Sequence, residues 1–597
     1  MKSLLNWIED RTGLIGAARS YLDAPVPGGS SPAKVLPCTI LFAFIVQAVT
    51  GFFIWMYYSP SAQTAWESVY FLQHEVSGGW LLRSIHHYSA QVMLVLIGIY
   101  VVQMICSGSY RAPREFVFWI AVLMGICCLC LMLTGDLLAW DQNSHGATQV
   151  RVNFLTLLPL IGGDAYKLAA GGPAFGHLTL TRFLALHIGV FAGGLLLLLI
   201  LHGVLSRRTT AAEAERLSSA PPLWPNQAAL NAVACAVILI VVLLLCGRHE
   251  VGLGAPADPD PANFFAAARP EWAFLGLYEF SHLFPGELMI LPIFVIPGVL
   301  VCTVLAMPWI GRSRAGQLFN VGFTFFMLVA LAVLSVKSVV HDMHNEGHQA
   351  ALSEAAQQAD RVVELARGPQ GIPATGALTL LRNDPKTQGP RLFKLHCASC
   401  HNHADAEGNG ILAEESSAPN LHEFASREWL TGLLDPEQIK GPEYFGATKL
   451  KGGDMVAFVE DLLSDLEDDE REEVRKIVMA LSAQAKLKSQ RELDAKDAVA
   501  IEEGQSLLMD DYGCADCHKF HDKGQLGGAP DLTGYGSREW IVGIIGNPAH
   551  KQFYGKRNDR MPAYAELPDD SAENILSAKQ IGLLTDWLRG EWYEYCP

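Results

Sequence analysis

Arg83-Ser-Ile-His86-His87-Tyr88-Ser-Ala90 begins an apolar run that continues to about residue 107. The run is long enough to cross the roughly 30 Å hydrocarbon core of a membrane. A later apolar run contains Arg182, His187 and His202. The fifteen residues from His187 to His202 rise about 22 Å in about four helical turns, so the two histidines lie near opposite membrane faces on one side of their helix. Ionisable side chains cost several kcal/mol inside a membrane, so these residues point to a function.

Histidines on facing helices of a four-helix bundle can hold haem iron between them. His86 is the expected partner of His187. The residue expected to face His202 stands fourteen positions after His86, and it is Tyr100. The alternative is that these are buried histidines bonded to neighbouring carbonyls, and the nearby arginines count against it. The sequence therefore predicts one complete histidine pair and one altered pair.

Residues 30 to about 340 resemble cytochrome b of quinol:cytochrome c oxidoreductases, most of all the arrangement divided between cytochrome b6 and subunit IV. The resemblance rests on dispersed, co-linear motifs: Val46-Gln-Ala-Val-Thr-Gly51-Phe, Arg83-Ser-Ile-His86, Thr134-Gly135, Ala139-Trp140-Asp141-Gln142, Leu180-Thr-Arg182-Phe, Pro225-Asn226 and Pro270-Glu271-Trp272. It implies two b haems, one near each membrane face.

The resemblance also assigns the surroundings of these haems. Arg83 and Arg207 match arginines of the family, whereas Gln103 stands where relatives carry an arginine near the inner haem. Gly51 and Gly135 lack a side chain, so a flat ring can approach them closely, although simple helix packing would also explain them. Cys38 lies one turn from the position at which b6-type relatives attach an extra haem, and we expect no covalent link there.

The resemblance further implies a quinol-oxidation pocket in the segments 135–180 and 248–286. The family glutamate matched by Glu271, between Pro270 and Trp272, is thought to take a proton from quinol. Desolvation at an apolar interface favours the neutral carboxyl, which suits a group that cycles through protonation. A carboxylate that merely begins a helix is the alternative. Ala273 replaces an aromatic residue of the family, so the shape of the pocket differs.

Half of the 597 residues are hydrophobic, and they predict seven membrane spans at about 35–57, 80–107, 115–134, 181–205, 226–247, 287–309 and 318–340. If every run crosses, four basic clusters fall on one side: Lys2 to Lys34, Arg111 with Arg114, Arg207 to Arg216, and Arg312 with Arg314. The positive-inside rule makes that side cytoplasmic. We therefore expect a multi-pass protein of the inner (cytoplasmic) membrane whose C-terminal part lies on the periplasmic side.

That C-terminal part carries two Cys-x-x-Cys-His motifs, Cys397 to His401 and Cys514 to His518. The spacing is the attachment signature of c-type haem, in which two thiols bind the ring and the histidine binds iron. A zinc site is the alternative, but no second Cys or His pair stands at zinc spacing. Covalent haem is attached outside the cytoplasmic membrane, in agreement with the orientation deduced from charge.

The two motifs lie in an internal repeat. Ala418-Pro419-Asn420 is followed by Ser426-Arg-Glu-Trp429, and Ala529-Pro530-Asp531 is followed by Ser537-Arg-Glu-Trp540. Met455 and Met561 are the expected sixth iron ligands of the first and second unit. Residues 351–597 carry roughly −16 of the net charge of −17, which favours an acceptor with a basic face and argues against nucleic acid.

We therefore expect an all-α protein: an interfacial segment (1–34), a four-helix haem domain (35–210), a subunit IV-like domain (211–342), a linker with a short helical start (343–390) and two small cytochrome c domains (391–485 and 498–597). The leading hypothesis is a quinol-oxidising subunit with a b haem and two covalent c haems. Its expected partners are a separate Rieske protein, a membrane quinone, an electron acceptor and a second copy. The alternatives are a chain without a complete inner haem, and a haem-bearing scaffold that only anchors the c domains.

Overall fold

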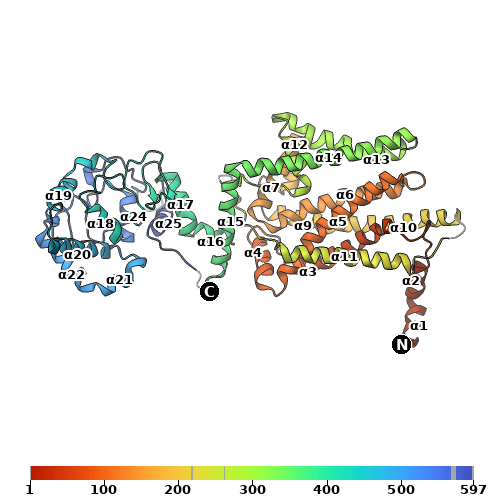
Figure 1. The fold of residues 1–597 in the computed structure, drawn as a ribbon, viewed down its shortest axis with the longest axis horizontal. Coiled ribbons are helices and arrows are strands. Elements are labelled where there is room, and N and C mark those ends of the chain that lie inside the picture. Colours follow the sequence, from red (N-terminus) through yellow and green to blue (C-terminus); the bar gives the residue numbers. More distant parts are fainter. Residues whose placement is uncertain (1, 217–219, 261–262, 567–572, 595–597) are drawn as a thin grey trace. The chain divides into compact units, whose positions relative to one another are not determined.

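The computed structural model describes residues 2–216, 220–260, 263–566 and 573–594 (Figure 1). Within these residues, seven helical stretches are long and apolar enough to cross a membrane. They are α3 (Leu36–Tyr57), α5 (Gly79–Ser107), α6 (Glu115–Asp136) with η3 (Leu137–Ala139), α9 (His177–Ala185) through η5 (Leu186–Ala192) into α10 (Gly193–Arg216), α11 (Asn226–Arg248), η8 (Gly286–Met289) through η9 (Leu291–Val295) to α13 (Ile296–Ile310), and α14 (Arg314–His344). The prediction of a helical membrane bundle is confirmed.

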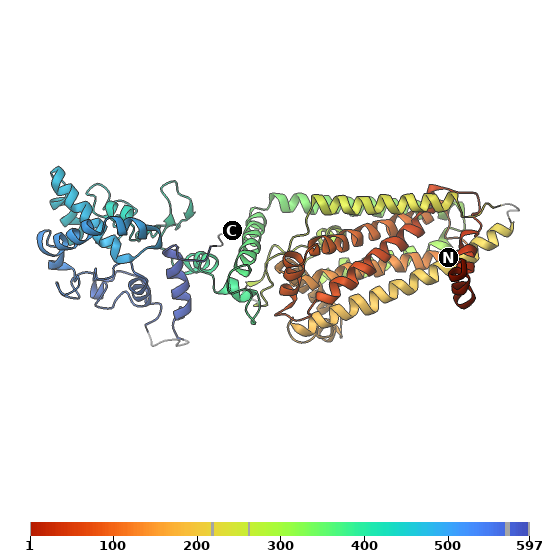
Figure 2. The ribbon, with the colours of Figure 1, turned by 90° about the horizontal axis from the view of Figure 1, so that it is seen from below.

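The first four spans form one bundle. Helix α3 packs against α5, and α6 packs against both α5 and α10. Their shared core includes Ile97, Met124 and Leu195, each with 1% or less of its surface exposed. Figure 2 shows these helices running alongside one another. Apolar side chains cover both the core and the lipid-facing sides, as expected for helices surrounded by hydrocarbon.

Short elements connect the spans at one end of the bundle: α4 (Ala65–Tyr70), η2 (Phe71–Glu75), α7 (Gln142–Asn153), η4 (Phe154–Leu157), α8 (Gly162–Ala170), η7 (Trp272–Phe274) and α12 (Leu275–Ser281). Asp141 caps α7 by accepting a hydrogen bond from Ser144 N at 2.9 Å. The other carboxylate oxygen accepts from Gly254 N at 3.3 Å, and Trp66 Nε1 donates to Gly254 O at 2.7 Å. The segment after α11 is thereby held against α7 and α4.

At the N-terminus, in the segment expected to be interfacial, α1 (Lys2–Thr12), α2 (Leu14–Leu22) and η1 (Pro32–Lys34) precede the first span.

The expected linker differs from the structure. Residues 346–366 form a helix of about six turns, α15 (Glu346–Ala366), which packs against α14 and belongs to the first compact unit. Asn345 begins the helix by accepting from His348 N at 3.0 Å, and Val362 is fully buried. Gln142 Nε2 of α7 donates to Gln358 Oε1 at 2.7 Å. These contacts explain why a polar, Ala-rich segment is helical here.

The second compact unit contains residues 367–369 and 379–597. Its helices are α16 (Leu378–Arg382), α17 (Pro385–His396), α18 (Arg427–Leu433), α19 (Asp454–Leu462), α20 (Asp468–Ala485), α21 (Arg491–Lys496), α22 (Ala498–Ser506), α23 (Cys514–Cys517), α24 (Arg538–Gly546) and α25 (Ala578–Leu588), with shorter turns η10 (Lys449–Gly452), η11 (Lys488–Gln490), η12 (Leu507–Asp511) and η13 (Gly555–Arg557). Strands β1 (His403–Ala404) and β2 (Gly410–Ile411) pair antiparallel.

The two expected cytochrome c domains share one core. Helix α17 of the first repeat packs against α25 of the second, with the Phe393 and Trp587 ring centroids 5.5 Å apart. The Arg589 guanidinium donates to Ala485 O at 2.9 Å and to Gly536 O at 2.5 Å. Apolar residues of both repeats thus bury one another, so the boundaries expected at residues 485 and 498 do not separate two cores.

Candidate functional site

The first candidate site surrounds His86 and His187, where each imidazole touches a threonine. His86 Nδ1 lies 2.9 Å from Thr50 Oγ1, and His187 Nδ1 lies 3.1 Å from Thr134 Oγ1. Each hydroxyl donates its own hydrogen to the carbonyl four residues earlier, at 2.7 and 2.8 Å. The hydroxyl oxygens therefore accept from Nδ1–H, which leaves Nε2 of both rings with a free lone pair.

The residue after each threonine is a glycine that makes room for the same imidazole. A Cβ at Gly51 would lie 2.9 Å from His86 Cε1, and a Cβ at Gly135 would lie 2.8 Å from His187 Cε1. Two Thr-Gly pairs from α3 and α6 thus hold two histidines from α5 and η5 in matching ways. His187 lies in the π-helical turn η5, a distortion often found at functional sites. The donor set fits a haem iron bound from two sides.

Arg83 lies one helical turn before His86. Its guanidinium donates to Gln73 Oε1 at 3.1 Å, to Val251 O at 2.8 Å and to Gly252 O at 3.1 Å. These contacts join α5 to the segment that leads toward Glu271. The position of the side chain as a haem neighbour stays a prediction.

The second candidate site surrounds His202 and has a different arrangement. His202 Nε2 lies 3.0 Å from the Tyr100 hydroxyl, and the two rings meet edge to face with centroids 5.5 Å apart. His202 is 5% exposed. Nε2 is the nitrogen that stays free in His86 and His187, so here a phenol occupies the position of a second ligand. The residues around His202 do not fit a haem bound by two histidines.

Neighbouring residues at this level also have partners within the protein. Gln103 Nε2 donates to Ala33 O at 2.7 Å, and the Arg207 guanidinium lies 4.7 Å from the centre of the Tyr21 ring. Tyr100 lies fourteen residues after His86. The matching positions, fourteen residues before Gly51 and Gly135, are occupied by Pro37 and Ala121. Ala121 is fully buried, so no pair of glycines opens space for a ring here.

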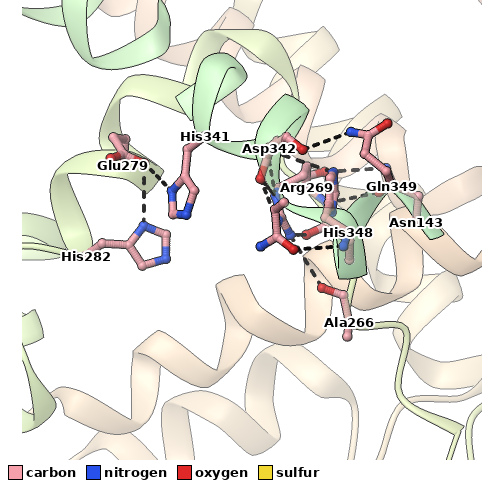
Figure 3. Close-up of polar contacts among 11 residues, drawn as sticks. Asn143, Ala266, Arg269, Glu279, His282, His341, Asp342, His348 and Gln349 are labelled. Atoms are coloured by element: carbon pink, nitrogen blue, oxygen red, sulfur yellow. Dashed lines mark hydrogen bonds and ion pairs between the residues drawn. The ribbon is translucent and has the colours of Figure 1, made fainter. Parts of the chain in front are cut away.

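The third candidate site contains Glu271, and the residue two positions before it anchors this segment (Figure 3). The Arg269 guanidinium binds both carboxylate oxygens of Asp342 on α14, at 2.8 to 3.0 Å. The backbone N–H of Arg269 donates to Asn143 Oδ1 of α7 at 3.0 Å. Glu271 and Pro270 are half-buried, whereas Trp272 is 44% exposed. Two helices therefore fix the backbone that carries Glu271, and neither contact was foreseen from the sequence.

The pKa of Glu271 is raised to about 7. Burial is the main cause, the negative charges of Asp136 and Asp141 add to it, and the Arg151 guanidinium opposes it. Arg151 NH2 forms an ion pair with Asp136 Oδ2 at 2.6 Å. A carboxyl whose pKa lies near neutrality can both take up and release a proton at physiological pH, as a general base must.

Glu279 is a buried carboxylate in the same region, and Figure 3 shows it facing two histidines. It is 3% exposed; its oxygens lie 2.9 Å from Lys337 Nζ, 3.8 Å from His282 Nδ1 and 4.0 Å from His341 Nδ1. The Lys337 ammonium offsets the buried negative charge, so this group ties α12 to α14.

In the second unit the two Cys-x-x-Cys-His motifs share one geometry. His401 Nδ1 donates to Pro419 O at 2.7 Å, and His518 Nδ1 donates to Pro530 O at the same distance. Both prolines belong to the repeated triplet that the sequence singled out. Nε2 of each histidine therefore carries the free lone pair, which suits an iron ligand.

The repeat extends to the tryptophans. Ser426 and Ser537 cap α18 and α24, and each accepts from the backbone N–H of the tryptophan three residues later. Trp429 Nε1 donates to Asn420 O at 3.0 Å, and Trp540 Nε1 donates to Asp531 O at 2.8 Å. The triplet beside each histidine is therefore tied to the helix that follows. These repeated contacts fit two like haem-binding units.

The structure places the four motif cysteines and the two predicted methionines as follows. Cys397 and Cys514 pack against the shared core of the second unit, and so does Met561; Cys400 is half-buried and Cys517 is exposed. Met455 is the second residue of α19 and packs against a separate cluster that includes Ile439 and Val459. The pairing of each methionine with its histidine stays a prediction.

The family model described as cytochrome b (N-terminal)/b6/petB matches residues 91–263. The menaquinol:cytochrome c reductase cytochrome b subunit of Geobacillus thermodenitrificans is 33% identical over 216 residues, which are 35% of this chain and 96% of that protein. Cytochrome b6 of Synechococcus elongatus is 30% identical over 208 residues, 35% of this chain and 97% of that protein. The cytochrome bc complex cytochrome b subunit of Chlorobaculum thiosulfatiphilum is 31% identical over 312 residues, 50% of this chain and 71% of that protein.

Proposed function

Because the chain belongs to the cytochrome b family, we propose that it is the membrane subunit at which a quinol:cytochrome c oxidoreductase of the bc type oxidises its quinol. The observation that carries this proposal is the pair of Thr-Gly contacts, which prepare His86 and His187 alike with Nε2 free. A haem held by these two histidines would supply a one-electron acceptor within the membrane.

Glu271 is the proposed proton acceptor. A quinol loses two protons and two electrons when it becomes a quinone; one electron would pass to the Rieske protein, the other to a b haem held by His86 and His187, and the second proton to water. The Glu271 carboxylate takes one of these protons, and its pKa of about 7 lets it release the proton again. Arg269, bound to Asp342 and Asn143, keeps the backbone in place while the carboxyl changes charge. Pro270 and Trp272 complete the proposed pocket wall.

The environment of His202 supports the alternative in which the chain lacks a complete inner haem. Tyr100 engages Nε2, Tyr21 covers Arg207, and a buried alanine, Ala121, stands where the outer site has Gly135. We therefore assign no electron transfer to this site. In a chain of this kind both electrons from quinol would leave on the side of the quinol pocket, toward the two c haems and the acceptor, without the usual relay to the other side.

We further propose that the second unit carries two covalent c haems, attached to Cys397, Cys400, Cys514 and Cys517. His401 and His518 would bind iron, and Met455 and Met561 would supply the second protein ligand of each haem. The matching bonds from both histidines to Pro419 and Pro530 support this assignment.

The proposed partners follow from this chemistry: a Rieske iron–sulfur protein in a separate chain, a membrane quinone, an electron acceptor and a second copy of the chain. We place the protein in the inner (cytoplasmic) membrane. The acidic second unit lies on the periplasmic side, because the basic clusters mark the opposite face. Helix α15, which leads to the second unit, contacts α7 beside the Glu271 segment, in agreement with a quinol pocket on the same side.

The test is reduction of the purified protein by menadiol, a naphthoquinol, followed in the absorption bands of b-type and c-type haem. The proposal predicts reduction of both types, slowed by Glu271→Gln while the haem bands keep their positions. A chain that contains both haem types yet is not reduced by quinol in its complex would be the scaffold that only anchors the c domains.

A further inference from the structure

We propose that Arg151, held in place by Asp136, binds an oxygen atom of the quinol ring in front of Glu271. The inference deepens the proposed function and depends on it, since it names a substrate-binding residue of the same pocket. Arg151 lies in the last turn of α7, and its ion pair with Asp136 joins it to the end of α6.

One terminal nitrogen of the Arg151 guanidinium, NH1, makes no hydrogen bond within the described residues. Nε donates to Ala147 O at 3.1 Å, and NH2 donates to Asp136 Oδ2 and to Thr148 Oγ1, both at 2.6 Å. NH1 is buried and has no acceptor within the described residues. A buried guanidinium N–H without an acceptor is unfavourable. An acceptor oxygen on a bound molecule would therefore stabilise NH1.

The position of Arg151 near Glu271 indicates which molecule would supply the acceptor oxygen. The guanidinium, Asp136 and Asp141 are the charged groups close enough to Glu271 to affect it electrostatically. Asp136 directly follows Thr134 and Gly135, the residues that contact His187. The ion pair therefore lies near the proposed proton acceptor and at the end of α6 that contacts His187. A quinol hydroxyl or quinone carbonyl in this position can accept from NH1.

Asp136 is the positioning residue of this arrangement. A guanidinium presents its donors in a rigid plane, so the bond from NH2 to Asp136 sets the direction of NH1. The Asp136 side chain is 12% exposed and that of Arg151 is 18% exposed, so water screens the pair only in part. Without Asp136 the guanidinium would lose both its direction and a compensating charge.

Substitutions of Arg151 and Asp136 are expected to shift the pH dependence of the rate in opposite directions, which a merely structural role would not do. The Arg151 charge lowers the pKa of Glu271, whereas the Asp136 charge raises it. If the Glu271 carboxylate is the base, the rate falls as the pH drops through its pKa. Arg151→Gln is therefore expected to move this acidic limb to higher pH by about one unit, and Asp136→Asn is expected to move it to lower pH.

The experiment uses the full chain in its complex, with menadiol as the reductant and menadione, its oxidised form, as the binding probe. Menadione binding is followed by quenching of tryptophan fluorescence, because Trp140 and Trp272 belong to the same region. Arg151→Gln is expected to weaken menadione binding about tenfold or more and to raise KM for menadiol. Arg151→Lys keeps the charge but not the planar donors, so it is expected to preserve the pH limb while still weakening binding.

The matched control is Arg427→Gln in the second unit. Arg427 forms an ion pair with Asp494 at 2.7 Å, and its side chain has the same exposed fraction of 18%. This variant is expected to lower the thermal midpoint without changing menadione binding or the pH profile. Arg151→Gln with wild-type binding and a wild-type pH limb would overturn the inference, as would a loss of thermal stability alone. Failure of the proposed function would look different, because the wild-type protein itself would not oxidise menadiol.

Discussion

The pH dependence of quinol oxidation follows directly from the environment of Glu271. With a pKa of about 7, the carboxylate form is about one tenth populated at pH 6, half populated at pH 7 and about nine tenths populated at pH 8. If this carboxylate accepts the proton, kcat/KM for menadiol rises about tenfold between pH 6 and pH 8. An exposed glutamate with an ordinary pKa would be almost fully ionised throughout and would give a flat profile.

The assay is steady-state oxidation of menadiol by the purified complex, with the reduction of a soluble cytochrome c as the signal. Glu271→Gln is expected to remove the acidic limb and to lower the rate by about a hundredfold or more, the usual contribution of a general base. Glu287→Gln, at an exposed position on η8, is the control and is expected to leave the profile unchanged. A limb near pH 7 that persists in Glu271→Gln would show that another group accepts the proton.

Three further substitutions test other parts of the structure. Tyr100→His is expected to create a low-spin b haem with His202, seen by electron paramagnetic resonance; an unchanged spectrum would mean that packing also excludes the ring. Replacing Cys514 and Cys517 together by serine is expected to halve the haem stain that survives denaturing electrophoresis, and undiminished stain would refute covalent attachment there. Asp342→Asn is expected to lower the quinol oxidation rate with unshifted haem bands, because it loosens the segment before Glu271, and an unaltered rate would contradict that role.

The sequence predicted the seven spans closely, because a membrane span needs about twenty apolar residues in a row and composition alone reports this. It also predicted that His86 and His187 differ from His202, since helical spacing converts positions in the chain into levels in the bundle. The structure adds that Thr50 and Thr134 fix the two imidazoles. A threonine inside an apolar helix gives no signal of its partner.

The sequence could not predict contacts between distant parts of the chain. The ion pair of Arg269 joins residues 73 positions apart, and no local pattern indicates which carboxylate an arginine binds. The shared core of the second unit also depends on contacts between distant residues. Two repeats of ordinary domain size predict two separate cores, but the packing of Phe393 against Trp587 joins them. The polar sequence of 346–366 indicates only a short helix, because the contacts that stabilise the full helix are made with other parts of the chain.

A count of haem by type in the purified protein tests the central claim most directly. Acidified acetone extracts b haem and leaves thioether-bound haem on the polypeptide. The geometry around His86, His187, His401 and His518 predicts one low-spin, histidine-ligated b haem and two covalent c haems per chain. Two low-spin b haems with two histidine ligands each, or the absence of covalent haem from protein made in a host that attaches c-type haem, would contradict the account.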